Sequence, residues 1–328
     1  MGCRILWIGM VALPACTSSG PTQRASPPWK DSSPHEVRFV SVAPGVRLEV
    51  LDWGGSGPPL VFLAGLQDVA HGFDEFAPQF TDHHHVLAIT RRGYGASSQP
   101  DSGYDLAGRV ADLHAVLDSL RLERVALAGH SIAGDELTAF AGAYPDRLSR
   151  LVYLDAAYDH SDLRPLLSQY PPPPPMLAAD SASPGAVQAY QQRVFGMRIP
   201  EAQLRAIGRY DSHGRLVANV TSAAIDSLIL IGCGHPDYSA VHAPALVIYA
   251  MVDSAPDMFP SWSTLGAGDR AAARRFTDVF QSWATTERAR VRRELREAQI
   301  LELHGANHYV FDSHRVEVTG AMRSFLTE

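Results

Sequence analysis

The chain contains 328 residues, of which 46% are hydrophobic and only 19% charged, so it is neither a disordered chain nor a small protein that depends on disulfides. The length suits one large α/β domain, or a core domain that carries an insertion. The formal net charge of -7 disfavours a partner held mainly by phosphate contacts, so we expect no nucleic-acid ligand.

The N-terminus has the pattern of an export signal. Arg4 precedes an apolar run over residues 5–13, and small residues stand before Cys16. The run is shorter than the roughly 20 residues that a membrane-spanning helix needs, so we expect residues 1–15 to be a cleaved signal peptide. Residues 13–16, Leu-Pro-Ala-Cys, resemble the bacterial lipobox, in which the cysteine becomes the lipidated first residue of the mature protein.

This resemblance implies a location in the bacterial cell envelope. A lipidated Cys16 would anchor the protein to a membrane, whereas an ordinary signal with an incidental cysteine would release a secreted protein. Residues 16–35 are rich in Ser, Pro and Thr, as a flexible tether is. Cys3 would leave with the signal and Cys233 has no partner, so we expect no disulfide. Residues 36–328 remain as the folded domain.

From residue 36 onward, short apolar runs alternate with helical patterns. Residues 37–42 and 47–53, on either side of Pro44-Gly45, predict an antiparallel pair of strands. Continuous apolar runs predict strands that are buried on both faces, as in a parallel sheet, at residues 60–63, 86–89, 125–128, 151–154, 245–250 and 300–303. Because helical patterns separate these strands, we predict a doubly wound, mostly parallel α/β sheet.

The segment at about residues 157–241 interrupts this alternation. It begins near a proline run at residues 171–175 and contains helix-like pieces that start at Pro184 and Pro200. No convincing buried strand is present in it. We interpret the segment as a cap inserted between two strands of the sheet.

One serine lies at a predicted sharp turn from a strand into a helix. Residues 129–134, Gly-His-Ser-Ile-Ala-Gly, surround Ser131 with the small neighbours that such a strained turn requires. Ser131 would then lie at a helix N-terminus, where free amides stabilise negative charge. The usual pattern is G-x-S-x-G, and Ala133 replaces its last glycine. The alternative is a helix-capping serine, which the preceding strand disfavours.

A serine nucleophile needs a base, and the base needs a carboxylate that fixes its tautomer. Two histidines, His304 and His308, follow the predicted strand at residues 300–303. His304 lies at the strand end, whereas His308 lies in the following loop, from which a side chain can reach a neighbouring strand end. We therefore choose His308 as the base and expect His304 to be structural.

Three aspartates are candidates for the carboxylate. Asp253 follows the strand at residues 245–250 and gives the chain order Ser, Asp, His, so we choose it. Asp155 ends the strand at residues 151–154 and is the rival, and Asp257 is a weaker one.

Together these motifs resemble the α/β-hydrolase fold superfamily in its capped, serine-nucleophile branch. Residues 90–97, Thr-Arg-Arg-Gly-Tyr-Gly-Ala-Ser, are similar to its R-G-x-G-x-S turn. Residues 64–67, Ala-Gly-Leu-Gln, match the segment that usually reads H-G and supplies an oxyanion amide. The resemblance implies that the backbone amides of Leu66 and Ile132 form the oxyanion hole, with Ala64 in place of the family's histidine.

These observations predict a carboxylesterase-like serine hydrolase that cleaves a small-molecule ester through an acyl-enzyme and needs no cofactor. A proline-iminopeptidase-like aminopeptidase and a carbon-carbon bond hydrolase are the alternatives on the same fold. A surface lipoprotein that binds a ligand with little turnover is the alternative from another class. The consecutive histidines at residues 83–85 lack the spacing of metal ligands, so we expect a surface turn there and predict no metal site.

Overall fold

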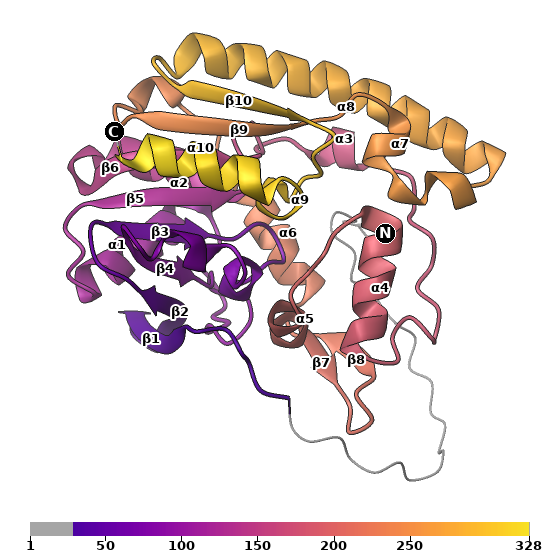
Figure 1. Ribbon diagram of the computed structural model, residues 1–328, viewed down its shortest axis with the longest axis horizontal. Helices are drawn as coiled ribbons and strands as arrows, with labels where there is room; N and C mark the ends of the chain where they lie inside the picture. The colour runs from indigo at the N-terminus through magenta and orange to yellow at the C-terminus, as the bar shows by residue number, and fades with distance from the viewer. Residues whose placement is uncertain (1–28, 328) are drawn as a thin grey trace.

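The computed structural model describes residues 29–327, so the predicted signal peptide, Cys16 and most of the predicted tether lie outside the described residues. The described residues form an eight-stranded sheet with the strand order β1-β2-β4-β3-β5-β6-β9-β10. Helices cover both faces of this sheet, and a further group of elements lies beyond one end of its strands (Figure 1).

The N-terminal part of the sheet is antiparallel. β1 (Glu36–Ala43) and β2 (Val46–Gly54) form the predicted pair, and Gly45 between them has a φ of 73°, which glycine adopts without strain. β2 also pairs antiparallel with β4 (His85–Ile89).

The remaining strands run parallel to β4, as the continuous apolar runs predicted. They are β3 (Pro59–Leu63), β5 (Val125–His130), β6 (Leu148–Leu154), β9 (Ala245–Met251) and β10 (Gln299–His304). The prediction of a doubly wound, mostly parallel sheet is therefore confirmed. β10 differs from the prediction in being largely open to solvent, because it is the edge strand and only Leu303 in it is fully buried.

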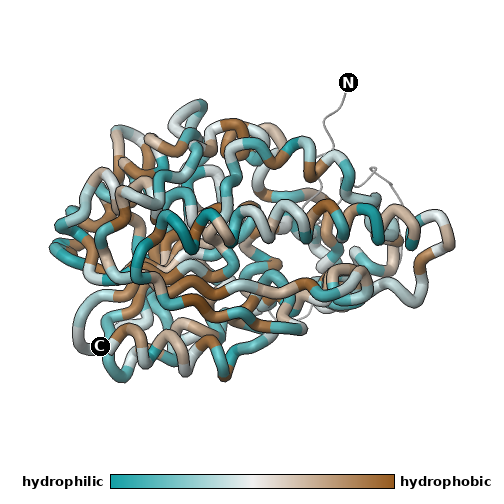
Figure 2. Tube along the Cα trace, turned by 90° about the horizontal axis from the view of Figure 1, so that it is seen from above, coloured by the Kyte–Doolittle hydropathy of each residue, from teal (hydrophilic) through white to brown (hydrophobic). Residues whose placement is uncertain are grey.

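Each face of the sheet carries its own hydrophobic core. Helices α1 (Leu106–Ser119), α2 (Ala133–Ala143) and α8 (Ala267–Glu294) pack on one face. The other face is covered by η1 (Ala70–Phe73), η2 (Ala77–Phe80), α9 (Val310–Ser313) and α10 (Arg315–Thr327). Figure 2 shows hydrophobic residues concentrated on the central strands and hydrophilic residues on the outer helices. Within residues 29–327, no helix is both long and apolar enough to cross a membrane.

The chain between β6 and β9 forms a group of short elements. They are α3 (Arg164–Leu167), α4 (Pro184–Phe195), α5 (Glu201–Ile207), β7 (Gly208–Tyr210), β8 (Leu216–Asn219), α6 (Ala223–Ile231) and η4 (Tyr238–Ala240). We call residues 157–241 the cap segment. Figure 1 places α4, α5, β7 and β8 beyond one end of the sheet. The β7–β8 hairpin was not predicted, because its strands are short and β8 exposes every residue except Leu216.

Buried polar contacts fasten the cap segment to loops of the sheet. The Asp226 carboxylate on α6 accepts hydrogen bonds from the Tyr94 hydroxyl at 2.6 Å and from Gln67 Nε2 at 2.7 Å. Gln203 on α5 donates to the Asp68 carboxylate. Burial raises the pKa of Asp226, and the hydrogen bonds from Tyr94 and Gln67 oppose that rise. The loop that follows β3 is therefore in direct contact with two cap helices.

Candidate active site

Ser131 lies at the turn between β5 and α2 with a φ of 55°, in the left-handed region that few non-glycine residues adopt. Its neighbours must be small. A Cβ atom at Gly134 would lie 1.8 Å from the Ala156 carbonyl oxygen, and one at Gly129 would lie 2.6 Å from Leu137 Cδ1. The glycines of the motif therefore permit the close approach of α2 to the sheet that presents Ser131.

A chain of hydrogen bonds joins three side chains at the carboxyl ends of the strands. His308 Nε2 lies 2.9 Å from Ser131 Oγ, and His308 Nδ1 lies 2.6 Å from Asp155 Oδ2. His308 is in the loop between β10 and α9, and Asp155 directly follows β6. With Nδ1 protonated toward Asp155, Nε2 is free to accept the proton of the serine hydroxyl.

The prediction that Asp253 orients His308 is wrong. Asp253 accepts a hydrogen bond from His304 Nδ1 at 2.8 Å, and the two side chains are 55% and 64% exposed. The rival Asp155 occupies the position beside His308, because β6 is the direct neighbour of β5 in the sheet, whereas β9 is one strand farther away. The weaker rival Asp257 accepts instead from the Ser254 hydroxyl at 2.7 Å.

Asp155 is held rigidly. Its Oδ1 accepts from the Tyr158 hydroxyl at 3.0 Å and from the Ala250 amide at 3.1 Å, and its own amide donates to the Ile248 carbonyl at 2.7 Å. Burial and the charge of Asp155 raise the pKa of Tyr158, so the Tyr158 hydroxyl stays protonated and remains a donor. Both carboxylate oxygens thus have partners, and Oδ2 faces His308.

Leu66 and Ile132 are the residues whose amides the sequence analysis assigned to an oxyanion hole. Both residues line the same cavity as Ser131. Ile132 is the N-cap of α2 and no side chain caps this helix, and within residues 29–327 neither amide has a hydrogen-bond acceptor. Two free amides beside a serine hydroxyl can bind an oxyanion. The assignment of these two amides to an oxyanion hole stays a prediction.

A buried arginine that the sequence analysis did not single out as a site residue supports this loop. Arg91 donates to the carbonyls of Ala64 at 2.9 Å and Gly65 at 3.1 Å, and its guanidinium pairs with Glu136 at 2.7 Å. Arg91 belongs to the Arg-Arg-Gly turn after β4, and that motif was its only signal in the sequence. Arg91 therefore fixes the segment in which Ala64 replaces the family's histidine.

A cavity of about 170 Å³ opens above Ser131. Its wall is mainly apolar and includes Leu163, Leu166, Leu167, Tyr170, Phe195, Met197, Leu230, Val252, Met258, Phe280 and Trp283. These residues come from the cap segment and also from the chain that follows β9, which contributes Val252 and residues of α7 (Ala255–Met258) and α8. The sequence analysis missed this second contribution, because α7 is short and α8 has the periodicity of an ordinary surface helix.

A second buried histidine lines the cavity. His160 Nδ1 lies 2.7 Å from Asp135 Oδ1, and the two side chains are 7% and 0% exposed. Burial lowers the pKa of His160, but the charge of Asp135 and its hydrogen bond raise it above the usual value. The His160–Asp135 pair is separate from the triad of Ser131, His308 and Asp155, because no hydrogen bond joins it to His308 within the described residues.

The three consecutive histidines point apart. His83 is exposed beside Asp82, His84 is buried with its Nδ1 3.1 Å from the Pro58 carbonyl, and His85 Nε2 lies 2.9 Å from Asp52. Their rings contact different partners, as expected for adjacent residues of an extended chain. His84 departs from the expected surface turn, because it packs beneath the loop at Pro58.

The comparisons with known proteins agree with this architecture. The alpha/beta hydrolase fold family matches residues 58–207. The crystal structure of E-2-(acetamidomethylene)succinate hydrolase superposes with a TM-score of 0.63 at 19% identity, over 90% of this chain and 100% of that one. The chain has the α/β-hydrolase fold. The turn at Ser131, the loop at Leu66 and the strands on either side are all within the matched residues.

Curated relatives match parts of this chain. A non-heme chloroperoxidase of Streptomyces lividans is 34% identical over 120 residues, which are 36% of this chain and 44% of the relative. Epoxide hydrolase A of Mycobacterium tuberculosis is 41% identical over 90 residues, which are 26% of this chain and 28% of the relative. The chain thus spans less than half the length of these relatives. Together with the fold, they support a hydrolase.

Proposed function

We propose that the protein is a serine hydrolase that cleaves carboxylic esters through an acyl-enzyme on Ser131. The observation that carries this proposal is the chain of hydrogen bonds from Ser131 through His308 to Asp155 beside an apolar cavity. Reactions of this fold that use a carboxylate nucleophile are disfavoured, because the turn carries the hydroxyl of Ser131 in place of a carboxylate.

In the proposed acylation, Ser131 Oγ attacks the ester carbonyl carbon while His308 Nε2 takes the hydroxyl proton. The carbonyl oxygen becomes an oxyanion that accepts hydrogen bonds from the amides of Leu66 and Ile132. The bond to the alcohol oxygen then breaks, and His308 returns its proton to that oxygen. Asp155 stabilises the imidazolium of His308 between these two transfers without taking a proton.

The proposed deacylation repeats these steps with water as the nucleophile. His308 Nε2 removes a proton from water, the hydroxide forms a bond to the acyl carbon, and the bond to Ser131 Oγ breaks as the serine regains its proton. The products are a carboxylic acid and an alcohol. All groups needed for both half-reactions belong to this chain.

The cavity wall indicates an apolar substituent on the ester. Burial of each additional methylene group contributes about 0.8 kcal/mol, which is about a fourfold gain in binding. We therefore expect kcat/KM to rise with acyl chain length until the cavity of about 170 Å³ is filled. Asp257 also lines the cavity, and this carboxylate favours aminopeptidase activity as the second candidate, because it can bind the ammonium group of an aminoacyl substrate.

Labelling with a fluorophosphonate probe tests the nucleophile. We expect one label per chain in the wild type, no label in Ser131→Ala, and full labelling of Ser324→Ala, whose serine is exposed on α10. Equal labelling of Ser131→Ala and the wild type would reject the proposal.

A substrate panel then tests the reaction class. Aryl esters of increasing acyl length, lactones and aminoacyl arylamides are compared by kcat/KM, and the proposal requires that esters exceed arylamides. If arylamides are faster and Asp257→Asn removes that preference, the aminopeptidase candidate replaces the esterase.

We also propose that the protein is exported and anchored in a bacterial envelope membrane by lipid on Cys16. The support is the pattern of residues 1–16, with a basic start, an apolar run and a lipobox-like end. Acyl chains contribute about 0.8 kcal/mol per buried methylene, so two or more chains hold a soluble domain firmly. Cys16→Ser is expected to remove the protein from the membrane fraction, whereas Cys3→Ser leaves it there. A soluble wild-type protein would reject the anchor.

A further inference from the structure

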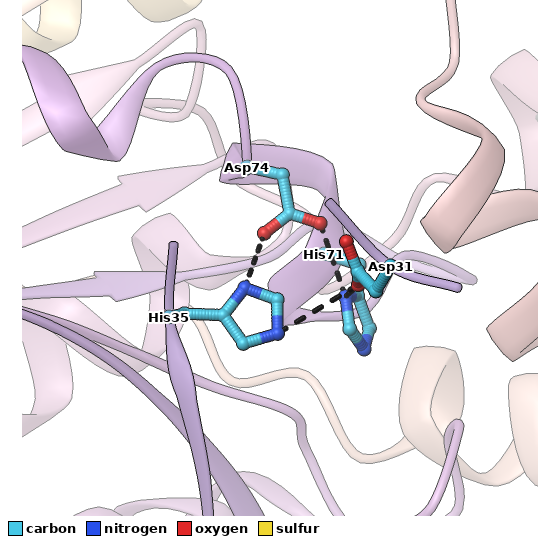
Figure 3. A group of neighbouring side chains, drawn as sticks. All are labelled: Asp31, His35, His71 and Asp74. Atoms are coloured by element: carbon cyan, nitrogen blue, oxygen red, sulfur yellow. Dashed lines mark hydrogen bonds and ion pairs between the residues drawn. The ribbon is translucent and has the colours of Figure 1, made fainter. Parts of the chain in front are cut away.

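Two histidines and two aspartates from separate segments meet on the side of the molecule near β1. Asp31 and His35 lie in the segment that leads into β1, His71 lies in η1, and Asp74 follows η1. Figure 3 shows the four side chains pointing toward one another. One ligand atom from each residue lies within 4.8 Å of all the others. None of the four residues lines the cavity above Ser131.

The spacing of these atoms approaches that of a tetrahedral site. His71 Nδ1 lies 3.1 Å from Asp74 Oδ2 and 3.4 Å from Asp31 Oδ2, and His35 Nε2 lies 3.7 Å from Asp31 Oδ2. Zinc with ligands at about 2.0–2.1 Å places neighbouring ligand atoms about 3.3–3.4 Å apart in a tetrahedron. Small shifts of the half-buried Asp31 side chain therefore suffice to complete the geometry.

The charges around the cluster favour a cation. Glu49, whose side chain is 6% exposed, adds a third carboxylate beside Asp31 and Asp74. Within residues 29–327, no lysine or arginine forms an ion pair with any of these three carboxylates, and the ion pairs that they do form are with His35 and His71. Buried carboxylates ordinarily have a cationic partner or a metal ion.

Glu49 also lies beside the ring nitrogen of His71 that faces away from the cluster. His71 directs Nδ1 into the cluster, and its other ring nitrogen, Nε2, lies 3.9 Å from Glu49 Oε1. The Thr90 hydroxyl donates to Glu49 Oε2 at 2.7 Å and fixes the carboxylate. Metal-bound histidines commonly direct the second ring N–H to such a carboxylate, which orients the ring and increases its basicity.

We propose that Asp31, His35, His71 and Asp74 bind one zinc ion. Two imidazoles and two carboxylates form a set that suits Zn²⁺ among the common divalent ions, and the two aspartates balance its charge. The ion is structural, since four protein ligands leave no open coordination position for a substrate. It fastens the segment at residues 31–35 to η1 and so fixes the point at which the chain enters the domain.

Metal binding to the chelator-treated protein tests this site directly. Isothermal titration with ZnCl₂ is expected to give one ion per chain, and Co²⁺ is expected to give the intense visible absorption of a tetrahedral site. Asp31→Asn and Glu49→Gln are expected to weaken zinc binding at least tenfold, as loss of a ligand or of its carboxylate support does. His71→Ala is expected to abolish it. The exposed His83 is the matched control, and His83→Ala should bind as the wild type does.

Thermal unfolding supplies a readout that does not depend on activity. Zinc is expected to raise the Tm of the wild type and of His83→Ala, and not that of Asp31→Asn at the same zinc concentration, because only ions that bind the folded chain stabilise it. If the wild type binds zinc no more tightly than Asp31→Asn, or if zinc leaves its Tm unchanged, the cluster is a network of ion pairs and the proposal is wrong. This test holds even if His71→Ala does not fold.

Discussion

Two histidine–aspartate pairs lie at the same edge of the sheet and differ in almost every physical respect. Asp155 and His308 are 7% and 26% exposed in their side chains, and Asp155 has two further donors on its other oxygen. Asp253 and His304 are 55% and 64% exposed and have no comparable support within the described residues. Only the first pair contacts Ser131.

The difference shows what a catalytic carboxylate requires beyond its place at a strand end. Asp253 follows a buried strand and stands between the serine and the histidine in the chain order, as Asp155 also does. Asp155 alone is desolvated, held by Tyr158 and Ala250, and placed one strand from the nucleophile. A fixed carboxylate in a low-dielectric setting stabilises an imidazolium far more than an exposed one can.

The largest expected effect is the difference in kcat between Asp155→Asn and Asp253→Asn. Asp155→Asn should lower kcat for ester hydrolysis by about 10⁴-fold, because the asparagine favours the wrong tautomer of His308. Asp253→Asn should leave kcat within about twofold, since the exposed pair that it breaks is worth little. Steady-state kinetics on one aryl ester measures both. A larger loss for Asp253→Asn would restore Asp253 as the catalytic acid.

Removal of the support for Asp155 should have an intermediate effect. Tyr158→Phe deletes the donor to Asp155 Oδ1 and should lower kcat about tenfold with little change in KM, as loss of one hydrogen bond to a charged group does. Tyr249→Phe is the matched control, because its hydroxyl donates to the Ala157 carbonyl at 3.1 Å and not to Asp155. Equal kcat values for the two variants would show that Asp155 does not depend on Tyr158.

A third histidine–aspartate pair, His160–Asp135, is expected to make the free energy of unfolding depend on pH. Because the pKa of His160 in the folded protein is raised above its usual value of 6.5, its charged form stabilises the fold below about pH 6.5. This contribution is lost as the pH rises through the folded pKa. Urea unfolding should therefore show a larger difference between wild type and His160→Gln at pH 5.5 than at pH 9.

The control for that experiment is the exposed His235, which pairs with Asp159. His235→Gln should change the free energy of unfolding little at either pH. A His160→Gln difference that grows toward high pH would mean that His160 is neutral in the folded protein.

The smallest effect is expected at His304. His304→Ala should change kcat less than about twofold and the free energy of unfolding by less than about 1 kcal/mol, which is typical of exposed ion pairs. Kinetics and urea unfolding measure the two quantities. A loss comparable to that of His308→Ala would show that the base lies at the strand end after all.

The sheet and two members of the triad could be predicted from the sequence because their signals are local. Apolar runs revealed the buried strands, and the small residues around Ser131 revealed the turn. The choice between Asp155 and Asp253 could not be made in this way, because it depends on the order of β5, β6 and β9 in the sheet. Parallel strands pair across long stretches of chain, and the order of the strands does not appear in the hydrophobic periodicity of the sequence.

The same limit explains what was missed elsewhere. The cavity wall from α7 and α8 and the cluster of Asp31, His35, His71 and Asp74 each combine residues from distant segments. Metal-ligand spacing within one segment, which the sequence analysis sought, cannot reveal such a site.

The anchoring of α6 has a further consequence for access to the cavity. Asp226 on that helix accepts a hydrogen bond from Gln67, and Gln67 is the neighbour of Leu66, which lines the cavity beside Ser131. The position of α6 and the position of this loop are therefore linked by a direct hydrogen bond. Leu230 on the same helix lines the cavity, so the contacts of Asp226 join one wall of the cavity to the loop that carries Leu66.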